Sequence, residues 1–328
     1  MGGSGYAGTA GDWRGLCLSL PPSPNEADAR EWFKSEFVPF AVSAGRNRNA
    51  LFTGYYEPEI QASRTEHGSY RTPIYGAPRD LVTADLGLFR KDLAGIRISG
   101  HVADARLIPF PSRAEIDAGG LGDAPVLLYT NDPVSLFFLH IQGSGRARLD
   151  NGSMLRLAYA GQNGRPYTPI GRALIAKGEI GRAQMSMQAI RAWLVSHPGE
   201  ARAVMESDQS YVFFHEAPIG DPRLGSLGTE GVPLTPEASI AVDPAHHALG
   251  VPMYVVADAT GDGGGRFSSL CIAQDTGGAI KGIARADIFW GFGARAESIA
   301  GGMKSGGNLY VLLPKVLAAR IGPHFEAR

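Results

Sequence analysis

Short apolar or alternating runs, separated by turn residues, dominate the pattern of this chain. They are LFTGYYEP (51–58), YVFF (211–214), ASIAVD (238–243), MYVVAD (253–258), SSLCIAQ (268–274) and NLYVLL (308–313), with Gly, Pro or Asp close to their ends. Runs of this length between such residues are typical of β-strands. The chain is therefore expected to be mostly β, with β-rich ends around a mixed middle. That order fits a domain inserted into another domain.

Four segments are predicted to form helices, either from the helical spacing of their apolar residues or from residues typical of helix ends. Asn25 is a suitable N-cap, and Thr168-Pro169 followed by Gly178 has the residues that begin and end a helix. The expected helices cover residues 25–37, 168–178, 186–196 and 198–206. The segment 124–142 is expected to form two strands around the turn Asn131-Asp132-Pro133, and ATGDGGGR (259–266) a flexible hairpin connection.

Composition narrows the class of protein. Hydrophobic residues make up 44% of the 328 residues and charged residues 19%, so the chain has enough apolar side chain to fold rather than to stay disordered. Its length corresponds to about two domains. The 31 basic and 32 acidic residues leave a net charge of −1, and no nucleic-acid partner is expected. The 44 Gly and 22 Pro are typical of many tight turns.

The termini and the cysteines add expectations about targeting. No run of about 18 apolar residues occurs, so no transmembrane segment is expected. Residues 1–13 show neither the basic nor the apolar region of a signal peptide, and the residues before Cys17 do not match a lipid-attachment pattern. The spacing of Cys17 and Cys271 excludes a zinc or CxxC motif but leaves open whether they pair.

Three aspartates next to apolar strands are the candidate catalytic residues. Asp287 precedes Ile288-Phe289-Trp290, and such neighbours can desolvate a carboxyl and raise its pKa, as a general acid requires. A structural hydrogen-bond acceptor is the alternative for Asp287 and the favoured interpretation of Asp275 and Asp243. No nucleophile elbow, phosphate loop or metal-ligand motif is present, so no metal is expected.

Two further segments have residues suited to a sugar ligand. In TGYYEP (53–58), Gly54 permits close approach of a ligand, and tyrosine rings can stack on sugar rings. A tyrosine pair in a barrel core is the alternative. In HIQGSG (140–145), Gln142 and Ser144 are neutral donors that match a polyhydroxylated, amide-bearing ligand. A hairpin turn is the alternative there.

Several motifs together resemble one family. TGYYEP, HIQGSG, YAGQNGRPYTPIG, MSMQAIRAW, YVFF and DTGGAIKG…DIFWG are similar to motifs of the membrane-bound lytic murein transglycosylase A (MltA) family, over about residues 51–314. The C-terminal part resembles that family's three-aspartate (3D) domain, with Asp243, Asp275 and Asp287 as the aspartates. The resemblance implies a double-psi β-barrel domain built from residues 1–60 and 218–328. It also implies a second β-containing domain with a few helices inserted at residues 61–217, and a large groove between the two.

The resemblance also implies an activity: cleavage of the β-1,4 bond between N-acetylmuramic acid (MurNAc) and N-acetylglucosamine (GlcNAc) in peptidoglycan, with formation of 1,6-anhydroMurNAc. Asp287 matches the single catalytic acid/base, and Asp275 and Asp243 are expected to support it. The residues expected to bind substrate are Thr53, Gly54, Tyr55, Gln142, Ser144 and Lys281, with a structural ion pair as the alternative for Lys281. The chemistry is proton transfer, so no cofactor is expected. The expected partners are peptidoglycan glycan strands and other cell-wall enzymes, and the expected location is the periplasm, in association with the outer membrane.

The sequence leaves two other functions open. Glu57 is an additional carboxylate beside the presumed groove. If it lay across the scissile bond from Asp287, the chain would be a two-carboxylate glycoside hydrolase. A non-catalytic, expansin-like peptidoglycan-binding module, built on a related barrel, is the second alternative.

Overall fold

The computed structural model describes residues 5–20, 25–44, 49–93, 96–260 and 264–321. It divides into two compact units. The barrel unit comprises Met1–Gly54, Leu227–Phe289 and Met303–Arg328, and the insert unit comprises Tyr55–Ser226 and Trp290–Gly302. These units are defined by the contacts within the chain. The domain boundaries expected from the sequence, at residues 60/61 and 217/218, stay a prediction.

The barrel unit is built from strands near both ends of the chain. They are β2 (Ala50–Glu57), β12 (Ser239–Val242), β13 (Pro252–Ala257), β14 (Phe267–Asp275), β15 (Arg285–Phe292) and β16 (Lys304–Pro314). Their order is β16-β13-β14-β12-β15-β2, and β2 pairs again with β16, so the six strands close into a barrel. β12 and β14 are parallel, whereas β13 is antiparallel to both of its neighbours. This arrangement confirms the expected barrel made from both ends of a mostly β chain, and it is consistent with a double-psi topology.

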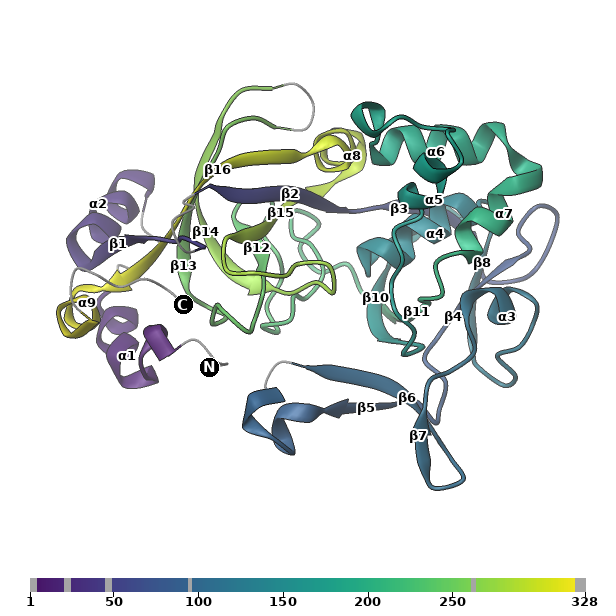
Figure 1. The fold of residues 1–328 in the computed structure, drawn as a ribbon, viewed down its shortest axis with the longest axis horizontal. Coiled ribbons are helices and arrows are strands. Elements are labelled where there is room, and N and C mark those ends of the chain that lie inside the picture. Colours follow the sequence, from purple (N-terminus) through teal and green to yellow (C-terminus); the bar gives the residue numbers. More distant parts are fainter. Residues whose placement is uncertain (1–4, 21–24, 45–48, 94–95, 261–263, 322–328) are drawn as a thin grey trace. The chain divides into compact units, whose positions relative to one another are not determined.

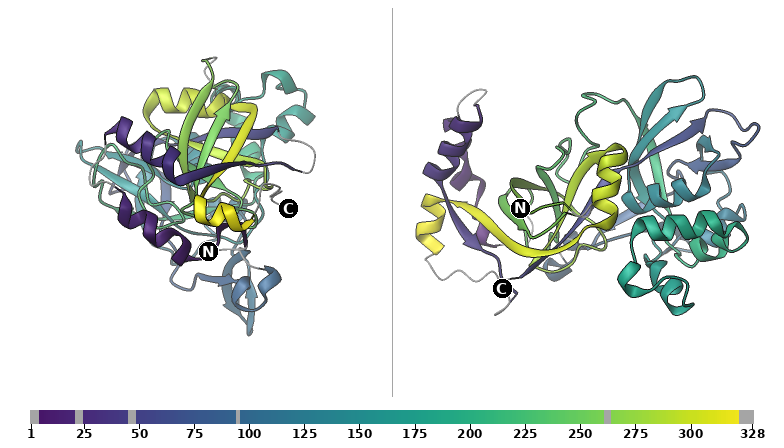
Figure 2. Two further views of the ribbon diagram at one scale, coloured as in Figure 1. Left: turned by 90° about the vertical axis from the view of Figure 1, so that its left-hand side faces the viewer. Right: turned by 90° about the horizontal axis from the view of Figure 1, so that it is seen from above.

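One further strand and three helices lie against the outside of this barrel (Figures 1 and 2). β1 (Phe37–Ala41) pairs with β16, and α2 (Glu26–Glu36) packs against β1. α9 (Lys315–Ile321) follows β16, and α1 (Ala10–Ser19) contacts β16. The predicted start of α2 is confirmed, because the side chain of Asn25 accepts a hydrogen bond from the backbone N–H of Asp28 at 2.9 Å.

The insert unit contains a second six-stranded sheet and a small three-stranded sheet. The first has the order β11-β10-β9-β3-β8-β4, with β3 (Glu59–Ser63), β4 (Thr72–Tyr75), β8 (Val126–Thr130), β9 (Gly145–Leu149), β10 (Met154–Gln162) and β11 (Val212–Ala217). A bridge between Gly76 and Phe214 links its two edges. The second sheet is β5 (Val82–Asp85), β6 (Arg97–Ala103) and β7 (Arg106–Ile108). Buried apolar residues such as Ile60, Leu128 and Leu157 form the core of the larger sheet.

Helices accompany the larger sheet of the insert unit, and those between residues 133 and 206 form a core of their own. They are α3 (Arg113–Asp117), α4 (Pro133–Gln142), α5 (Gly171–Ala176), α6 (Met187–Ser196), α7 (Pro198–Glu206) and α8 (Gly293–Gly302), and α6 contacts α4, α7 and α8 (Figure 1). Trp193 and Leu194 of α6 are buried in this core with Phe137 and Phe138 of α4. The predicted helices over 186–196 and 198–206 are confirmed as α6 and α7.

The prediction of a second strand after the turn at Asn131-Asp132-Pro133 is wrong, because residues 133–142 form α4. The side chain of Asp132 caps this helix by accepting from the N–H of Ser135 at 2.9 Å, and Pro133 occupies the first turn. Gly143, with φ of 80°, ends it. Five apolar residues of α4 and His140 are buried, so its sequence shows no polar face to reveal the helical period. Gln142 therefore lies at the end of a helix, not of a strand.

The helix predicted over residues 168–178 forms as the shorter α5 (Gly171–Ala176). α5 begins at Gly171, with Ile170 as its N-cap, later than the predicted start at Pro169. The N–H of Thr168 donates to the carboxylate of Asp208 at 2.8 Å. Its end near Gly178, which has φ of 77°, is as predicted. β13 and β14 are antiparallel, which confirms a hairpin connection over 259–266, although residues 261–263 lie outside the described part.

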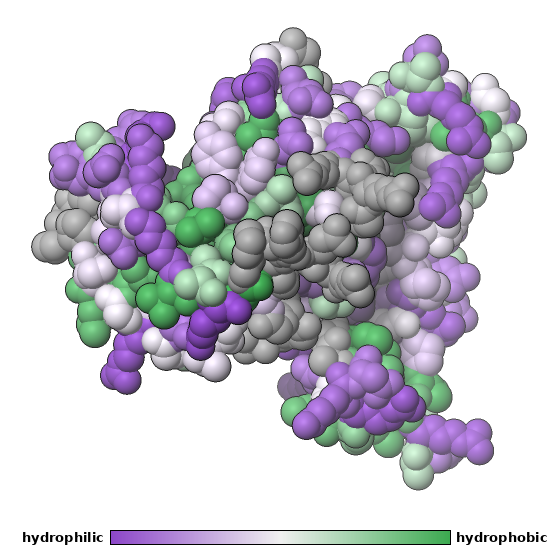
Figure 3. All heavy atoms as spheres, turned by 60° about the vertical axis from the view of Figure 1, so that its left-hand side comes forward, coloured by the Kyte–Doolittle hydropathy of each residue, from purple (hydrophilic) through white to green (hydrophobic). Residues whose placement is uncertain are grey.

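The distribution of polar and apolar side chains can be followed on one face of the molecule. Figure 3 shows hydrophilic and hydrophobic residues interspersed over the face that it presents. Among the described residues, no helix combines the length and the hydrophobicity needed to cross a bilayer.

Candidate active site

Asp287 lies in the middle of β15 in the barrel unit, half-buried between residues that are fully buried. Ile288 and Phe289 follow it and Ala286 precedes it, each at most 2% exposed. Burial raises the pKa of Asp287 to about 6, although a hydrogen bond from Thr53 and the charge of Arg285 act in the opposite direction. The charge of Asp275 raises the pKa further. A carboxyl group with this pKa holds a proton at a pH at which an ordinary aspartate has lost it.

Thr53 is the direct partner of Asp287. Its hydroxyl lies 2.5 Å from Oδ1 of Asp287 and donates to it. Thr53 belongs to β2, which is next to β15 in the barrel, so the two side chains meet although they are 234 positions apart in sequence. The structure thus brings together a predicted substrate-binding residue and the predicted catalytic carboxyl.

Arg285 is the residue of this site that the sequence interpretation missed. Its Nη2 atom donates to Oγ1 of Thr53 at 2.6 Å, and its Nη1 atom donates to the carbonyl of Ala286 at 2.6 Å. Burial lowers the pKa of the guanidinium, and the charge of Asp287 acts in the opposite direction. The signal was present in the sequence as Arg-x-Asp, because residues two apart on a strand point to the same face.

Asp275 and Asp243 anchor loops of the barrel unit. Oδ1 of Asp275, at the end of β14, accepts from the N–H and the hydroxyl of Thr229 at 3.0 and 2.9 Å and from the N–H of Thr276 at 2.9 Å. Asp243 follows β12 and accepts from the N–H of Gly282 at 2.7 Å, while Nζ of Lys281 lies 3.9 Å from its other oxygen. Lys281 therefore has the ion pair that the sequence left open as its alternative role.

The remaining predicted substrate-binding residues are divided between the units. Gly54 is the last residue of the first barrel-unit segment, and Tyr55, Gln142 and Ser144 belong to the insert unit. Within the insert unit, Oε1 of Gln142 accepts from the N–H of Tyr56 at 3.1 Å, and the hydroxyl of Ser144 lies 2.7 Å from that of Ser226. These bonds hold the end of α4 against the strand that carries Tyr55 and against the loop before residue 227.

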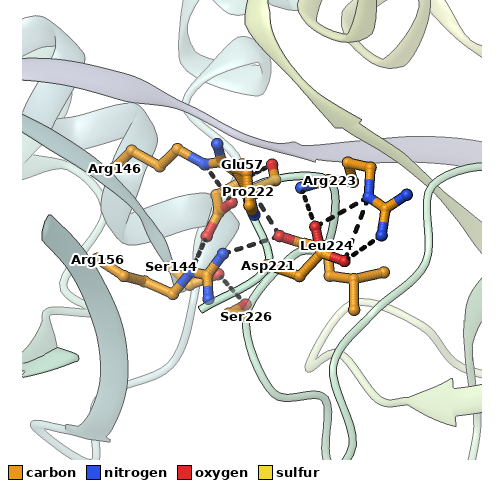
Figure 4. A network of polar contacts seen from close by, with 9 residues as sticks. All are labelled: Glu57, Ser144, Arg146, Arg156, Asp221, Pro222, Arg223, Leu224 and Ser226. Carbon is orange, nitrogen blue, oxygen red and sulfur yellow. Dashed lines mark hydrogen bonds and ion pairs between the residues drawn. The ribbon is translucent and has the colours of Figure 1, made fainter. Parts of the chain in front are cut away.

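Glu57 has a structural role. It is 1% exposed, and its two oxygens accept from Nε of Arg146 at 2.8 Å and from Nε of Arg156 at 2.7 Å (Figure 4). The same guanidiniums donate to the carbonyls of Pro222 and Leu224. Both oxygens of Glu57 are thus occupied by buried arginines, which argues against Glu57 as a second catalytic carboxylate.

The described residues include no group of three or more His, Cys, Asp or Glu that could hold a metal ion. The buried ring of His247 contacts the hydroxyl of Tyr6 at 2.8 Å and the carbonyl of Ile283 at 2.6 Å.

Cys17 and Cys271 do not pair with each other: both are free, the first exposed and the second buried.

Comparison with known proteins gives a consistent result over both units. Residues 51–215 match the MltA specific insert domain, and residues 238–313 match the 3D domain. The membrane-bound lytic murein transglycosylase A of Escherichia coli (strain K12) is 36% identical over 271 residues, which are 80% of this chain and 66% of that protein. The chain thus spans just under two thirds of the length of that curated relative.

Solved structures resemble this chain over nearly its whole length. The crystal structure of a membrane-bound lytic murein transglycosylase from Agrobacterium tumefaciens is 34% identical with a TM-score of 0.85, covering 98% of this chain and 89% of that one. The crystal structure of E. coli MltA with bound chitohexaose is 30% identical with a TM-score of 0.74, covering 93% of this chain and 84% of that one.

Proposed function

This chain belongs to the MltA family, and on that premise we propose that it is a lytic transglycosylase of peptidoglycan. It would cleave the β-1,4 bond between MurNAc and GlcNAc and leave a 1,6-anhydroMurNAc end. The observation that carries the proposal is the half-buried Asp287, whose pKa is raised to about 6 and whose Oδ1 is held by Thr53. The bound chitohexaose in the E. coli structure supports a glycan chain as ligand.

Asp287 would act first as an acid and then as a base. The protonated carboxyl donates its proton to the O4 leaving group as the bond between C1 and O4 breaks. The resulting carboxylate takes the proton of the C6 hydroxyl while O6 forms its bond to C1. The muramic N-acetyl group stabilises the positive charge at C1 between these steps, as in substrate-assisted hydrolases.

One carboxylate is sufficient for this reaction. A glycosidase usually needs a second one, as nucleophile or to activate water. Here the nucleophile is the C6 hydroxyl of the same sugar, and its attachment to the ring supplies a high effective concentration. The occupation of Glu57 by two arginines agrees with a site that has no second protein carboxylate at work.

The other predicted residues would orient the glycan. Thr53, Gly54, Tyr55, Gln142, Ser144 and Lys281 are proposed to bind it, with Asp275 and Asp243 holding the loops around Asp287. Substrate strands of this kind place the protein in the cell envelope, and we propose the periplasm, in association with the outer membrane and with other cell-wall enzymes.

Product analysis tests the proposal directly. Purified sacculi are incubated with the protein, and the soluble muropeptides are identified by mass spectrometry. Anhydro ends support a lytic transglycosylase. Reducing ends would instead indicate a hydrolase, and binding without release would indicate an expansin-like module.

The same assay tests the role of Asp287, the proposed acid. Asp287→Asn cannot donate or accept the proton, so release should fall by roughly 1000-fold while sacculus binding is kept. Asp221→Asn is the matched control, because Asp221 lies on an exposed loop where it pairs with Arg223. Appreciable activity of Asp287→Asn would show that another group is the acid.

A further inference from the structure

Arg285 and Thr53 form a chain of two short hydrogen bonds that ends on Asp287. Nη2 of Arg285 lies 2.6 Å from Oγ1 of Thr53, and the same Oγ1 lies 2.5 Å from Oδ1 of Asp287. A guanidinium has only donors, so the hydroxyl oxygen must accept from it. The single hydrogen of the Thr53 hydroxyl is then directed to Asp287.

This direction decides where the proton of Asp287 resides. If Oδ1 carried the acidic proton, two hydrogens would face each other across 2.5 Å, which is unfavourable. Among the described residues of the barrel unit, none donates to Oδ2, the other oxygen. We propose that Arg285 is a positioning residue that, through Thr53, keeps the acidic proton of Asp287 on Oδ2, ready for transfer to the glycosidic oxygen. The inference rests on the proposed transglycosylase function.

The guanidinium is held firmly enough for this role. Nη1 donates to the carbonyl of Ala286 at 2.6 Å and approaches that of Leu51 at 3.5 Å. Leu51 and Thr53 lie on β2, and Ala286 lies on β15, so Arg285 spans two neighbouring strands. Its side chain therefore cannot turn away from Thr53 without breaking contacts to the backbone.

Arg285 also affects the pKa of Asp287. The groups that act on Asp287 are Arg285 from its own strand, Thr53 from β2 and Asp275 from the end of β14. The backbone partner of Asp287 on β12 is the apolar Ala241. The positive charge and the Thr53 hydrogen bond both lower the pKa of Asp287 against the larger effect of burial. Loss of either partner should therefore raise that pKa.

The test compares Arg285→Met, Thr53→Val and the double variant with the wild type. Release of anhydromuropeptides from soluble glycan strands is measured as kcat and KM across a range of pH. Each single variant should lower kcat by roughly 10- to 100-fold, because the proton is no longer confined to Oδ2. KM should change little in Arg285→Met, which leaves the proposed glycan-binding residue Thr53 in place. Activity requires the protonated acid, so the alkaline limb of the kcat/KM profile should move to higher pH.

Coupling and rescue distinguish this role from a merely structural one. The double variant should be about as slow as the slower single variant, because both changes break the same chain. Thr53→Ser keeps the hydroxyl and should retain most of the activity. Arg30→Met is the matched control, since Arg30 makes an exposed ion pair with Glu26 on α2. It should leave both the rate and the pH profile unchanged.

Three results would overturn the inference. They are an unshifted alkaline limb in both single variants, losses that multiply in the double variant, or a Thr53→Ser variant as slow as Thr53→Val. If circular dichroism shows that Arg285→Met is unfolded, the two Thr53 variants, which leave the guanidinium in place, decide the matter. Absence of anhydro products from the wild type would contradict the proposed function itself, whereas an active wild type with unaffected variants contradicts only the role of Arg285.

Discussion

The surroundings of Asp287 in the barrel unit and of Glu57 in the insert unit show two ways of placing a carboxylate beside arginine. Both oxygens of Glu57 accept directly from guanidiniums, and the side chain is 1% exposed. Asp287 instead meets a neutral hydroxyl, which in turn meets the guanidinium of Arg285. The direct pair leaves no oxygen of Glu57 for a substrate. The intervening hydroxyl bonds to Oδ1 of Asp287 alone, and burial raises the pKa of this carboxyl.

The Glu57 cluster is placed to hold the chain where it passes into the insert unit. Glu57 lies three residues after Gly54, and Leu224, whose carbonyl accepts from both arginines, lies two residues before Ser226. Phe292 lies two residues after Trp290, and the guanidinium of Arg146 stacks on its ring at 3.5 Å. The chain crosses between the two units at four points, and three of these points lie within a few residues of this buried ion cluster.

The largest change in stability is expected when Glu57 is substituted. Glu57→Gln leaves two buried guanidiniums without their carboxylate, and it should lower the free energy of unfolding by about 3–5 kcal/mol. Urea unfolding followed by circular dichroism measures the change, with Glu216→Gln, whose ion pair with Arg64 is more exposed, as the control. A stability close to that of the wild type would show that Glu57 is not a structural residue.

A smaller effect of opposite sign is expected at Asp287. Its pKa is about 6 in the folded chain and about 4 in an unfolded one, so the folded state binds more protons between these values. The stability contributed by the protonated group is therefore present below about pH 4 and lost as the pH rises through 6. Asp287→Asn should be more stable than the wild type at neutral pH, by about 1 kcal/mol after allowance for solvent screening.

Thermal unfolding of both proteins at several pH values measures this difference. It should shrink towards acidic pH, where the wild-type carboxyl is protonated. A variant that is less stable than the wild type at neutral pH would mean that the ionised carboxylate is favourable in the fold, as at Glu57, and the contrast between the two sites would disappear.

The smallest expected effect concerns Asp275. The charge of this group raises the pKa of Asp287, and an asparagine can still accept from Thr229 and Thr276 through Oδ1. Asp275→Asn should therefore move the alkaline limb of kcat/KM to slightly lower pH and lower the rate by roughly threefold. The same glycan-release assay measures both values. Unaltered turnover and an unaltered profile would remove Asp275 from the site.

Local sequence determined most of the elements. Short apolar runs between turn residues indicated the strands of the barrel, and the cap Asn25 marked the start of α2. The failure at α4 has a physical cause: a helix buried on nearly every side has no polar stripe, so its period is hidden. Only its end residues, Asp132 and Gly143, distinguished it from a strand.

At the site, the sequence by itself pointed to Asp287 as the candidate acid, because the apolar residues Ile288, Phe289 and Trp290 follow it directly. The tertiary structure decided the rest. Glu57 and its arginines are 89 and 99 positions apart, and Thr53 and Asp287 are 234 apart, so no local pattern pairs them. An apolar run is a local pattern that the sequence displays, whereas the burial of one side chain, its hydrogen bonds and its ion pairs depend on which strands the barrel and the sheet bring side by side.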